Sequence, residues 1–426
     1  MRGTTQMMGR ALLGALVVAF IATAGWSQSL TWLGTLPGYK RSAAFGVSAD
    51  GRVVVGAGID PTGYYWRAFR WTAAEGMQVL STPGYELSSV AWDISADGSV
   101  VAGEAWNAAR YGTACRWTAD GSVQYLGTLP GGFSSWAHAI SADGRVVVGT
   151  DHTPGWAQFR AFRWTEAGGM QDLGTLPDGD DAWAEGCSAD GSVVVGYANT
   201  IIDDWMEVWH AFRWTEAGGM QDLGTLPGYE WSGAAGVSAD GGTVVGVVTI
   251  AGNWYAGHAF RWTEAGGMQD LGTLPGGCCS HAFDVSADGS IVIGIAADAA
   301  EQWHAFRWTV LGGMEDLNLT YADLLTDGSV LTSANAISPD GRYIVGQGYN
   351  AATGRYEAYL LDTGPRCTAH SGDVDGNGCV DDADLLAVLI AFGNTGGNLG
   401  RVDTNCDGVV DDADLLIVLI NFGSGC

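Results

Sequence analysis

Short apolar segments separated by polar turns run through most of the chain, and one complete unit illustrates their pattern. Its four apolar segments are residues 137–141, 145–149, 160–165 and 170–176. The first and third alternate apolar and polar positions, so that Phe162 and Trp164 share one face, whereas the second is a β-branched run. Alternation predicts a half-buried strand, and a short β-branched run predicts a strand buried on both faces. We therefore expect four antiparallel strands per unit, as in one blade of a β-propeller.

The unit recurs along the chain with a period of about fifty residues. A turn motif, S-A-D-G or once S-P-D-G, marks each copy through its aspartate, at Asp50, Asp97, Asp143, Asp190, Asp240, Asp288 and Asp340. The seventh copy has no fourth strand, and residues 30–38 (L-T-W-L-G-T-L-P-G) supply that motif at the other end of the chain. This complementarity favours a closed, all-β, seven-bladed propeller of four-stranded blades over residues 29–362. A β-solenoid is the alternative.

The motifs of the third and fourth strands carry a family resemblance. H-A-F-R-W-T followed by D-L-G-T-L-P-G begins at His210 and His258, and a close copy begins at Arg160, with Arg in place of His. A further copy of the first motif begins at His304. These motifs resemble the HAF repeats of bacterial surface and secreted proteins. The resemblance covers residues 29–362 and implies an extracellular repeat protein, but no reaction, because that family is defined by its repeat.

Residues that are repeated from blade to blade are expected to serve the fold. The tryptophans of the R-W-T motif are predicted to pack blade against blade, at Trp71, Trp117, Trp164, Trp214, Trp262 and Trp308. The aspartates of the turn motif are expected to stabilise turns, and the HAF histidines are expected to have a structural role.

Function is expected at the positions that are not repeated. Three residues before the serine of each turn motif, the blades present Phe45, Trp92, His138, Glu185, Ala235, Phe283 and Asn335 at the predicted channel mouth. Together with the aromatic loops on the same face, the candidate ligand-binding residues are Trp92, Trp136, His138, Trp183, Glu185 and Trp231. The aromatic rings either shield blade edges or form a stacking platform for sugar rings. No catalytic residue is assigned, although His138 and Glu185 are candidates for an acid–base pair.

Charge and the N-terminal segment narrow the function classes. The 426 residues carry a formal net charge of −28, which argues against nucleic acid as a partner because phosphate binding needs clustered Lys and Arg. Residues 1–24 contain arginines followed by a short apolar run, and they end in A-T-A. This order of a basic region, an apolar region and a small-residue cleavage site is typical of a signal peptide. No later apolar stretch is long enough to span a membrane. We expect a secreted protein, extracellular or at the cell surface.

The composition changes after a short linker, residues 363–366. Two acidic stretches, 373–384 and 403–414, have the EF-hand-like spacing of a twelve-residue calcium loop. The predicted ligands are Asp373, Asp375, Asn377, Cys379 (through its carbonyl), Asp381 and Asp384 in the first loop, and Asp403, Asn405, Asp407, Val409 (through its carbonyl), Asp411 and Asp414 in the second. Oxygen donors at this spacing predict two calcium ions as cofactors.

Each calcium loop leads into an apolar helix, predicted at residues 385–392 and 415–422. The duplicated loop and helix over residues 367–426 resemble a type I dockerin module. The resemblance implies a calcium-loaded module whose helices dock a cohesin, so the expected partner is a cohesin-like or other cell-surface protein.

Eight cysteines in an exported chain predict disulfides. Four of them lie in the C-terminal module and allow three pairings, of which we favour Cys367 with Cys426 and Cys379 with Cys406. Cys115 and Cys187 stand at apolar repeat positions and are predicted to be small hydrophobic residues of the core. The adjacent pair Cys278 and Cys279 has no assigned role.

These features predict an exported, non-enzymatic binding or surface-assembly protein. The propeller would recognise a ligand, with a polysaccharide as the candidate, and the C-terminal module would attach the protein. One alternative is a secreted carbohydrate-active enzyme, a lyase or hydrolase with its site at the channel mouth. The other alternative is a structural component of the envelope.

Overall fold

The computed structural model describes residues 28–202, 206–250, 253–310, 312–364, 371–375, 377–394, 399–405 and 409–426. These residues divide into two compact units, a larger one over residues 28–364 and a smaller one over the described residues from 371 onward. The predicted signal peptide, residues 1–24, lies outside the described residues. Among the described helices, none combines the length and apolar character that crossing a membrane requires.

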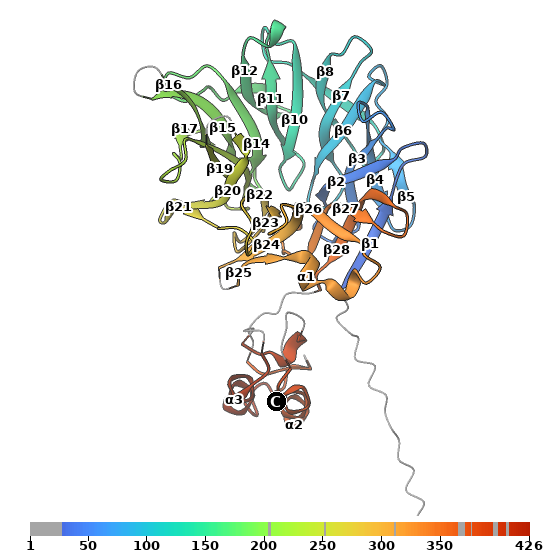
Figure 1. Cartoon of the computed structure of the whole chain (residues 1–426), viewed down its shortest axis with the longest axis vertical. Coiled ribbons are helices and arrows are strands. Elements are labelled where there is room, and N and C mark those ends of the chain that lie inside the picture. The colour runs from blue at the N-terminus through green and yellow to red at the C-terminus, as the bar shows by residue number, and fades with distance from the viewer. Residues whose placement is uncertain are drawn as a thin grey trace, which may run out of the picture. The chain divides into compact units, whose positions relative to one another are not determined.

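The larger unit is the predicted seven-bladed β-propeller, in which seven antiparallel sheets of four strands surround an axis (Figure 1). Blades 1 to 3 are β2 (Arg41–Val47), β3 (Val53–Ile59), β4 (Trp66–Thr72) and β5 (Gly76–Val79); β6 (Ser88–Ile94), β7 (Val101–Trp106), β8 (Gly112–Trp117) and β9 (Val123–Gly127); and β10 (Ser134–Ile140), β11 (Val146–His152), β12 (Phe159–Thr165) and β13 (Gly169–Asp172). Blades 4 to 6 are β14 (Ala182–Cys187), β15 (Val193–Ile202), β16 (Met206–Thr215) and β17 (Gly219–Asp222); β18 (Trp231–Val237), β19 (Thr243–Ile250), β20 (Asn253–Thr263) and β21 (Gly267–Asp270); and β22 (Ser280–Val285), β23 (Ile291–Ala297), β24 (Trp303–Thr309) and β25 (Gly313–Asp316). Blade 7 contains β26 (Val330–Ile337), β27 (Tyr343–Asn350) and β28 (Arg355–Asp362).

The N-terminal strand β1 (Ser29–Gly34) completes blade 7, as predicted. It pairs antiparallel with β28, so that Trp32 lies opposite Tyr359, and Figure 1 shows the blue β1 beside the orange β28. The sheet order β1-β28-β27-β26 therefore joins the two ends of the repeat and closes the ring.

A buried serine in the first strand ties neighbouring blades together. Ser232 Oγ accepts a hydrogen bond from the Ala211 amide at 2.8 Å and donates one to the Gly224 carbonyl of the preceding blade at 2.5 Å. Ser42 repeats both contacts across the closing seam, accepting from the Ala358 amide at 2.8 Å and donating to the Gly34 carbonyl at 2.6 Å. The seam between blades 7 and 1 is thus built like an ordinary junction.

The repeated residues have the structural roles that were predicted for them. In the turn of blade 1, Ser48 Oγ donates to Asp50 at 2.8 Å, and the same carboxylate accepts from the Arg52 amide. Trp214 is buried in a cluster that also holds Val146 and Val148 of the preceding blade. The HAF histidines pair with the aspartate that ends the fourth strand, at 2.9 Å in blades 4 and 5 and 2.6 Å in blade 6.

Two features of the blades differ from the prediction. The fourth strand of blade 3 was expected to reach residue 176 but ends at Asp172. Leu173 and Leu176 are buried in the core shared with blade 4, because the chain crosses there to the next blade. Short helical turns, which the pattern of apolar positions did not predict, also occupy connections between strands: η1 (Pro154–Trp156), α1 (Leu317–Thr320) and η2 (Ala322–Leu324).

The smaller unit contains α2 (Asp382–Ala391), η3 (Gly400–Val402) and α3 (Asp412–Ile420). Both α-helices begin three residues before the predicted starts, because Asp381 and Asp411 serve as N-caps and form capping boxes with Asp384 and Asp414. Five valines, Val374, Val380, Val388, Val410 and Val418, form the core of the unit.

The favoured disulfide pairing of the smaller unit is wrong, since Cys379 bonds to Cys426. The chain end explains the difference: the Val380 amide donates to the Ser424 carbonyl, and the Gly423 amide donates to the Val380 carbonyl, which brings Cys426 beside Cys379. Cys367 and Cys406 lie outside the described residues. In the propeller, Cys278 bonds to its neighbour Cys279. Cys115 is fully buried, as predicted, and the free Cys187 is partly buried.

Candidate functional site

The first strand of every blade carries a β-bulge at the same position. The pairing with the second strand skips one residue there, which is Phe45, Trp92, His138, Glu185, Ala235, Phe283 and Asn335 in blades 1 to 7. A bulge redirects the side chain of the extra residue. The second strand has a glycine opposite the kink, because a Cβ on Gly149, for example, would come within 1.9 Å of the Trp136 carbonyl oxygen. The bulge thus requires the glycine of the V-V-V-G motif.

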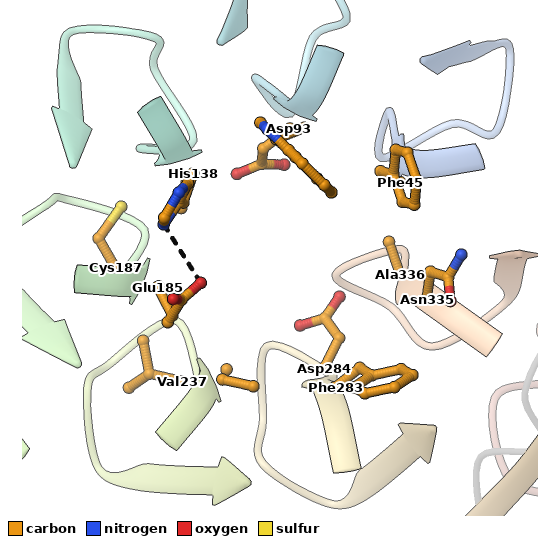
Figure 2. A pocket seen from close by; sticks show the side chains of 15 residues that line it. Phe45, Asp93, His138, Glu185, Cys187, Val237, Phe283, Asp284, Asn335 and Ala336 are labelled. Atoms are coloured by element: carbon orange, nitrogen blue, oxygen red, sulfur yellow. Dashed lines mark ion pairs between the residues drawn. The ribbon is translucent and has the colours of Figure 1, made fainter. Parts of the chain in front are cut away.

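The bulged residues surround a cavity of about 500 Å³ at the axis, which we call the axial cavity (Figure 2). Its remaining lining residues are Asp93, Ala139, Gly186, Cys187, Gly236, Val237, Asp284 and Ala336. All seven positions expected at the channel mouth line this cavity. Of the six candidate ligand-binding residues, the structure brings Trp92, His138 and Glu185 together here.

His138 and Glu185 form an ion pair between blades 3 and 4, drawn as the dashed line in Figure 2. His138 Nδ1 lies 3.2 Å from Glu185 Oε2 and 2.9 Å from the carbonyl oxygen of Ala184. Burial lowers the pKa of His138, but the carboxylates of Glu185 and Glu104 outweigh it and raise the pKa to about 9. The imidazole is therefore a cation at neutral pH.

Two aspartates of the axial cavity also bridge adjacent blades. Asp93 accepts hydrogen bonds from the amide of Ile94 at 2.7 Å and from that of Ile140 in blade 3 at 2.8 Å. Asp284 likewise accepts one hydrogen bond from a backbone amide of blade 6 and one from the Ile337 amide of blade 7, the latter at 2.9 Å. Burial raises the pKa of Asp93 to about 7 and that of Asp284 to about 6. The axial cavity therefore combines one histidine cation with several acidic groups.

A second cavity, of about 540 Å³, is formed by residues of blades 1 and 2 and shares Trp92 with the axial cavity. It is lined by Tyr64, Tyr65, Trp66, Leu87, Ser88, Val90, Trp92, Glu104, Trp106 and Arg110. We call it the aromatic pocket, because half of its lining residues are tyrosine or tryptophan. Tyr64, with 82% of its surface exposed, is the most accessible of these rings.

Hydrogen bonds to the backbone order the rim of the aromatic pocket. Asp60 Oδ1 accepts from the amides of Tyr64 and Tyr65 at 3.1 and 3.2 Å. Ser88 Oγ accepts from the Trp66 amide at 3.0 Å and thereby fixes the start of β4 against blade 2. The aromatic rings are thus presented by an ordered loop and by strand ends, which lowers the entropic cost of binding a ligand.

Glu104 is the acidic residue of the aromatic pocket, and the sequence analysis did not single it out. It follows the glycine of the second-strand motif, where the other blades have Ala57, Thr150, Tyr197, Val247, Ile295 and Gln347. Burial raises the pKa of Glu104 to about 7, while His138 and the indoles of Trp106 and Trp92 lower it. A carboxylate at a position that is uncharged in the other six blades was the available signal.

The other three candidate tryptophans line neither of these two cavities. Trp183 stacks on Phe159 with ring centroids 4.2 Å apart and on Tyr197 at 5.3 Å. Trp136 stacks on Trp106 at 6.0 Å. Trp231 lies partly buried at the start of β18. The faces of Trp136 and Trp183 are therefore shared with neighbouring rings, and ligand binding by these three residues stays a prediction.

The first acidic loop of the smaller unit gathers carboxylates at metal-ligating distance. Oxygen atoms of Asp373, Asp375 and Asp384 all lie within 4.8 Å of one another. Asp373 Oδ1 is buried without a hydrogen-bond partner among the described residues. Asp384 Oδ1 is fixed by the amides of Val374 and Asp375 at 2.6 and 3.0 Å. Hard oxygen donors around an unsatisfied buried carboxylate oxygen fit a calcium ion.

Several of the remaining predicted ligands form hydrogen bonds within the two loops. Asn377 Oδ1 accepts from the Cys379 amide at 2.7 Å, and the Asp381 carboxylate caps α2. In the second loop, Asp403 is buried, Asp414 Oδ1 accepts from the amides of Thr404 and Asn405, and Asp411 caps α3. Val409 is among the described residues, whereas Asp407 lies outside them.

Comparison with known proteins shows likeness at the level of the fold. No protein-family model matches the chain, and no curated protein gives a significant match. An oligogalacturonate lyase in complex with manganese matches 78% of this chain and 92% of that one, at 15% identity and a TM-score of 0.51. The match to the oligogalacturonate lyase of Vibrio parahaemolyticus covers 78% of this chain and 93% of that lyase, at 12% identity and a TM-score of 0.52. The match to TolB from Acinetobacter baumannii covers 74% of this chain and 82% of TolB, at 14% identity and a TM-score of 0.40.

Proposed function

We propose that this protein is an exported, non-enzymatic glycan-binding protein. The propeller binds a polysaccharide, and the calcium-loaded C-terminal unit attaches the protein to a partner in the extracellular space or at the cell surface. The observation that carries the proposal is the aromatic pocket, whose tyrosines and tryptophans surround a carboxylate, Glu104. Flat aromatic faces stack on the weakly polar faces of sugar rings, and a buried carboxylate orients hydroxyl groups by accepting their hydrogen bonds.

The size and construction of the aromatic pocket support this proposal. Its volume of about 540 Å³ is in the range of small-ligand sites. Trp66 and Trp92 both approach Phe45, with ring centroids 6.2 and 4.7 Å from that of Phe45. Trp92 therefore belongs to the walls of both cavities, and the proposed sugar site lies beside the aromatic lining of the axial cavity.

A secreted carbohydrate-active enzyme is the second candidate. The ion pair of His138 and Glu185 in the axial cavity supports it, and oligogalacturonate lyases share the propeller fold. With the pKa of His138 at about 9, however, the ring is protonated at neutral pH and has no free nitrogen with which to accept a proton. We therefore propose binding rather than proton abstraction as the role of this cavity.

The attachment role rests on the smaller unit. Asp373, Asp375 and Asp384 would hold a calcium ion in the first loop, and the corresponding residues would hold another in the second. Calcium would neutralise the clustered carboxylates and so stabilise the fold of the unit. Both helices expose apolar side chains at matching positions: Leu386 and Leu416, and Ile390 and Ile420, each more than half exposed. Such surfaces support docking to a cohesin-like or other cell-surface protein.

Polysaccharide pull-down with the full chain tests the proposal. Trp66→Ala and Trp106→Ala should each weaken binding severalfold or more, since a stacking ring contributes on the order of 1–2 kcal/mol. Glu216→Ala, on the exposed turn that leads into β17, is the matched control and should bind normally. Equal losses in all three variants, or no binding to any polysaccharide, would contradict the proposal. Shorter glycans released during incubation would favour the enzyme, and a protein that only assembles with itself would favour a structural envelope role.

A further inference from the structure

Glu104 is a carboxylate in a pocket whose walls supply no counter-charge in contact with it. In this region, His138 forms its ion pair with Glu185. Glu104 takes part in none of the ion pairs among the described residues. Its second-strand position places it in the lining with Trp66, Trp92 and Trp106. A carboxylate that is partly buried among rings loses part of its solvation by water, so a cation that enters the pocket is attracted to it.

The charges around Glu104 also favour a positive ligand. His138 is the cation whose charge lowers the pKa of Glu104, and its contact at 3.2 Å is with Glu185, so one imidazolium serves two carboxylates. Asp93 adds a further acidic group from the same blade to the adjoining cavity. Arg110 is the one basic residue that lines the aromatic pocket. It is exposed on a turn in which its amide donates a hydrogen bond to the Asn107 carbonyl. The Arg110 charge is therefore solvated by water, while the Glu104 carboxylate is partly buried.

We propose that the aromatic pocket is a binding site for an organic ammonium group, which is provided either by an amino sugar or by a quaternary ammonium compound. The proposal rests on the proposed function in one respect, that this pocket is the ligand site. The ring faces of Trp66, Trp92, Trp106 and the two tyrosines that line the pocket attract a cation by cation–π interaction, and a bound cation favours the ionised form of Glu104, which completes the cage. Rings alone would hold neutral sugars equally well, so Glu104 provides the selectivity.

The same charges disfavour acidic glycans. A galacturonate chain would bring carboxylates toward Glu104, Glu185, Asp93 and Asp284, against a protein with a formal net charge of −28. Repulsion between like charges in a cavity of low dielectric constant is costly. The ligand class inferred from the pocket therefore differs from the oligogalacturonate named for the lyases of similar fold.

Titration calorimetry on the full chain tests the inference with four probes: tetramers of glucosamine, N-acetylglucosamine and galacturonate, and choline. Glucosamine tetramer or choline should bind at least tenfold more tightly than the acetylated and acidic tetramers. If the acetylated or acidic tetramer binds as tightly as glucosamine, the ammonium site is refuted and glycan binding stands. If choline alone binds, the cation site is supported and the glycan function is refuted. If no probe binds, both proposals fail.

Two charge-removing variants decide which residue selects the ligand. Glu104→Gln keeps the size and the hydrogen-bonding oxygen but removes the charge, so the affinity for the ammonium probe should fall at least tenfold. Arg110→Gln removes the cation from the same lining and should leave that affinity unchanged or raise it. The opposite pattern, a loss with Arg110→Gln and none with Glu104→Gln, would show that the pocket recognises an anionic group and would overturn the inference.

Discussion

Removal of the N-terminal strand is the most direct test of how the propeller is held together. A chain that lacks residues 29–38 loses β1, and β28 is left as an unpaired edge in the last blade. It also loses the Gly34 carbonyl, which accepts the hydrogen bond from Ser42 at the junction with blade 1. This junction would then keep blade packing and the hydrogen bond from the Ala358 amide to Ser42 Oγ, without the strand that closes the sheet.

The expected cost follows from the apolar contacts of the segment. Leu33 and Leu36 are 7% and 2% exposed and pack with Phe69 of blade 1 and Val345 of blade 7. Loss of a buried leucine side chain costs about 2–5 kcal/mol, so the two together account for about 4–10 kcal/mol before any hydrogen bond is counted. Because a whole domain is stable by about 5–15 kcal/mol, the truncated propeller should be largely unfolded or should aggregate.

Denaturant unfolding followed by tryptophan fluorescence can measure graded versions of this change. Leu36→Ala should lower the free energy of unfolding by about 2–5 kcal/mol. Ser42→Ala should lower it by about 1–3 kcal/mol, because it leaves a buried amide and a carbonyl unsatisfied. Ser232→Ala removes the same two contacts at an ordinary junction and is the matched control. A truncated chain as stable as the parent, or a silent Ser42→Ala beside a costly Ser232→Ala, would refute closure by β1.

Three further predictions test the blades and the smaller unit. Gly149→Ala should destabilise the propeller by several kcal/mol in denaturant unfolding, because the new Cβ would lie 1.9 Å from the Trp136 carbonyl oxygen. The pKa of Asp93 is about 7 in the native state and 3.8 in the unfolded chain, so the native state binds more protons between these two pH values. The free energy of unfolding should therefore fall as pH rises from about 4 to 7. Asp93→Asn should reduce this fall. Calorimetry should count two calcium ions per chain, and none after Asp373→Ala with Asp403→Ala.

The sequence predicted the architecture because the information was repeated. Seven copies of the same alternation set the number of blades, and the displaced motif at residues 30–38 showed how the ring closes. Strand ends were less predictable, since Leu173 and Leu176 are as apolar as strand residues but serve the crossover to the next blade. A pattern of apolar positions records burial, and burial does not distinguish a strand from a connection that packs on the core.

The site was predictable where it depended on repeat position and unpredictable where it depended on local backbone geometry. His138 and Glu185 were expected at the channel mouth from their distance to the turn motif, and both line the axial cavity. Glu104 was missed because the second strand was predicted to end at the glycine, one residue before this position, whereas β7 continues to Trp106. The pairing of Cys426 with Cys379 was missed because it depends on the last residues returning to Val380, which no local pattern records.

The bulge in each first strand explains how one repeat can carry a specific site. Its geometry is set by the backbone and by a glycine on the neighbouring strand, as at Gly149, so the bulged side chain takes no part in the ladder of the blade. The same position therefore accommodates phenylalanine, tryptophan, histidine, glutamate, alanine and asparagine without loss of the sheet. Because the sheet itself does not select among these residues, their identities are free to be selected by contacts around the axis, such as the His138–Glu185 pair, or by a ligand. The unrepeated Glu104 lies one strand further out, paired with Val90 in the ladder, and its side chain extends the site from the axis into the aromatic pocket.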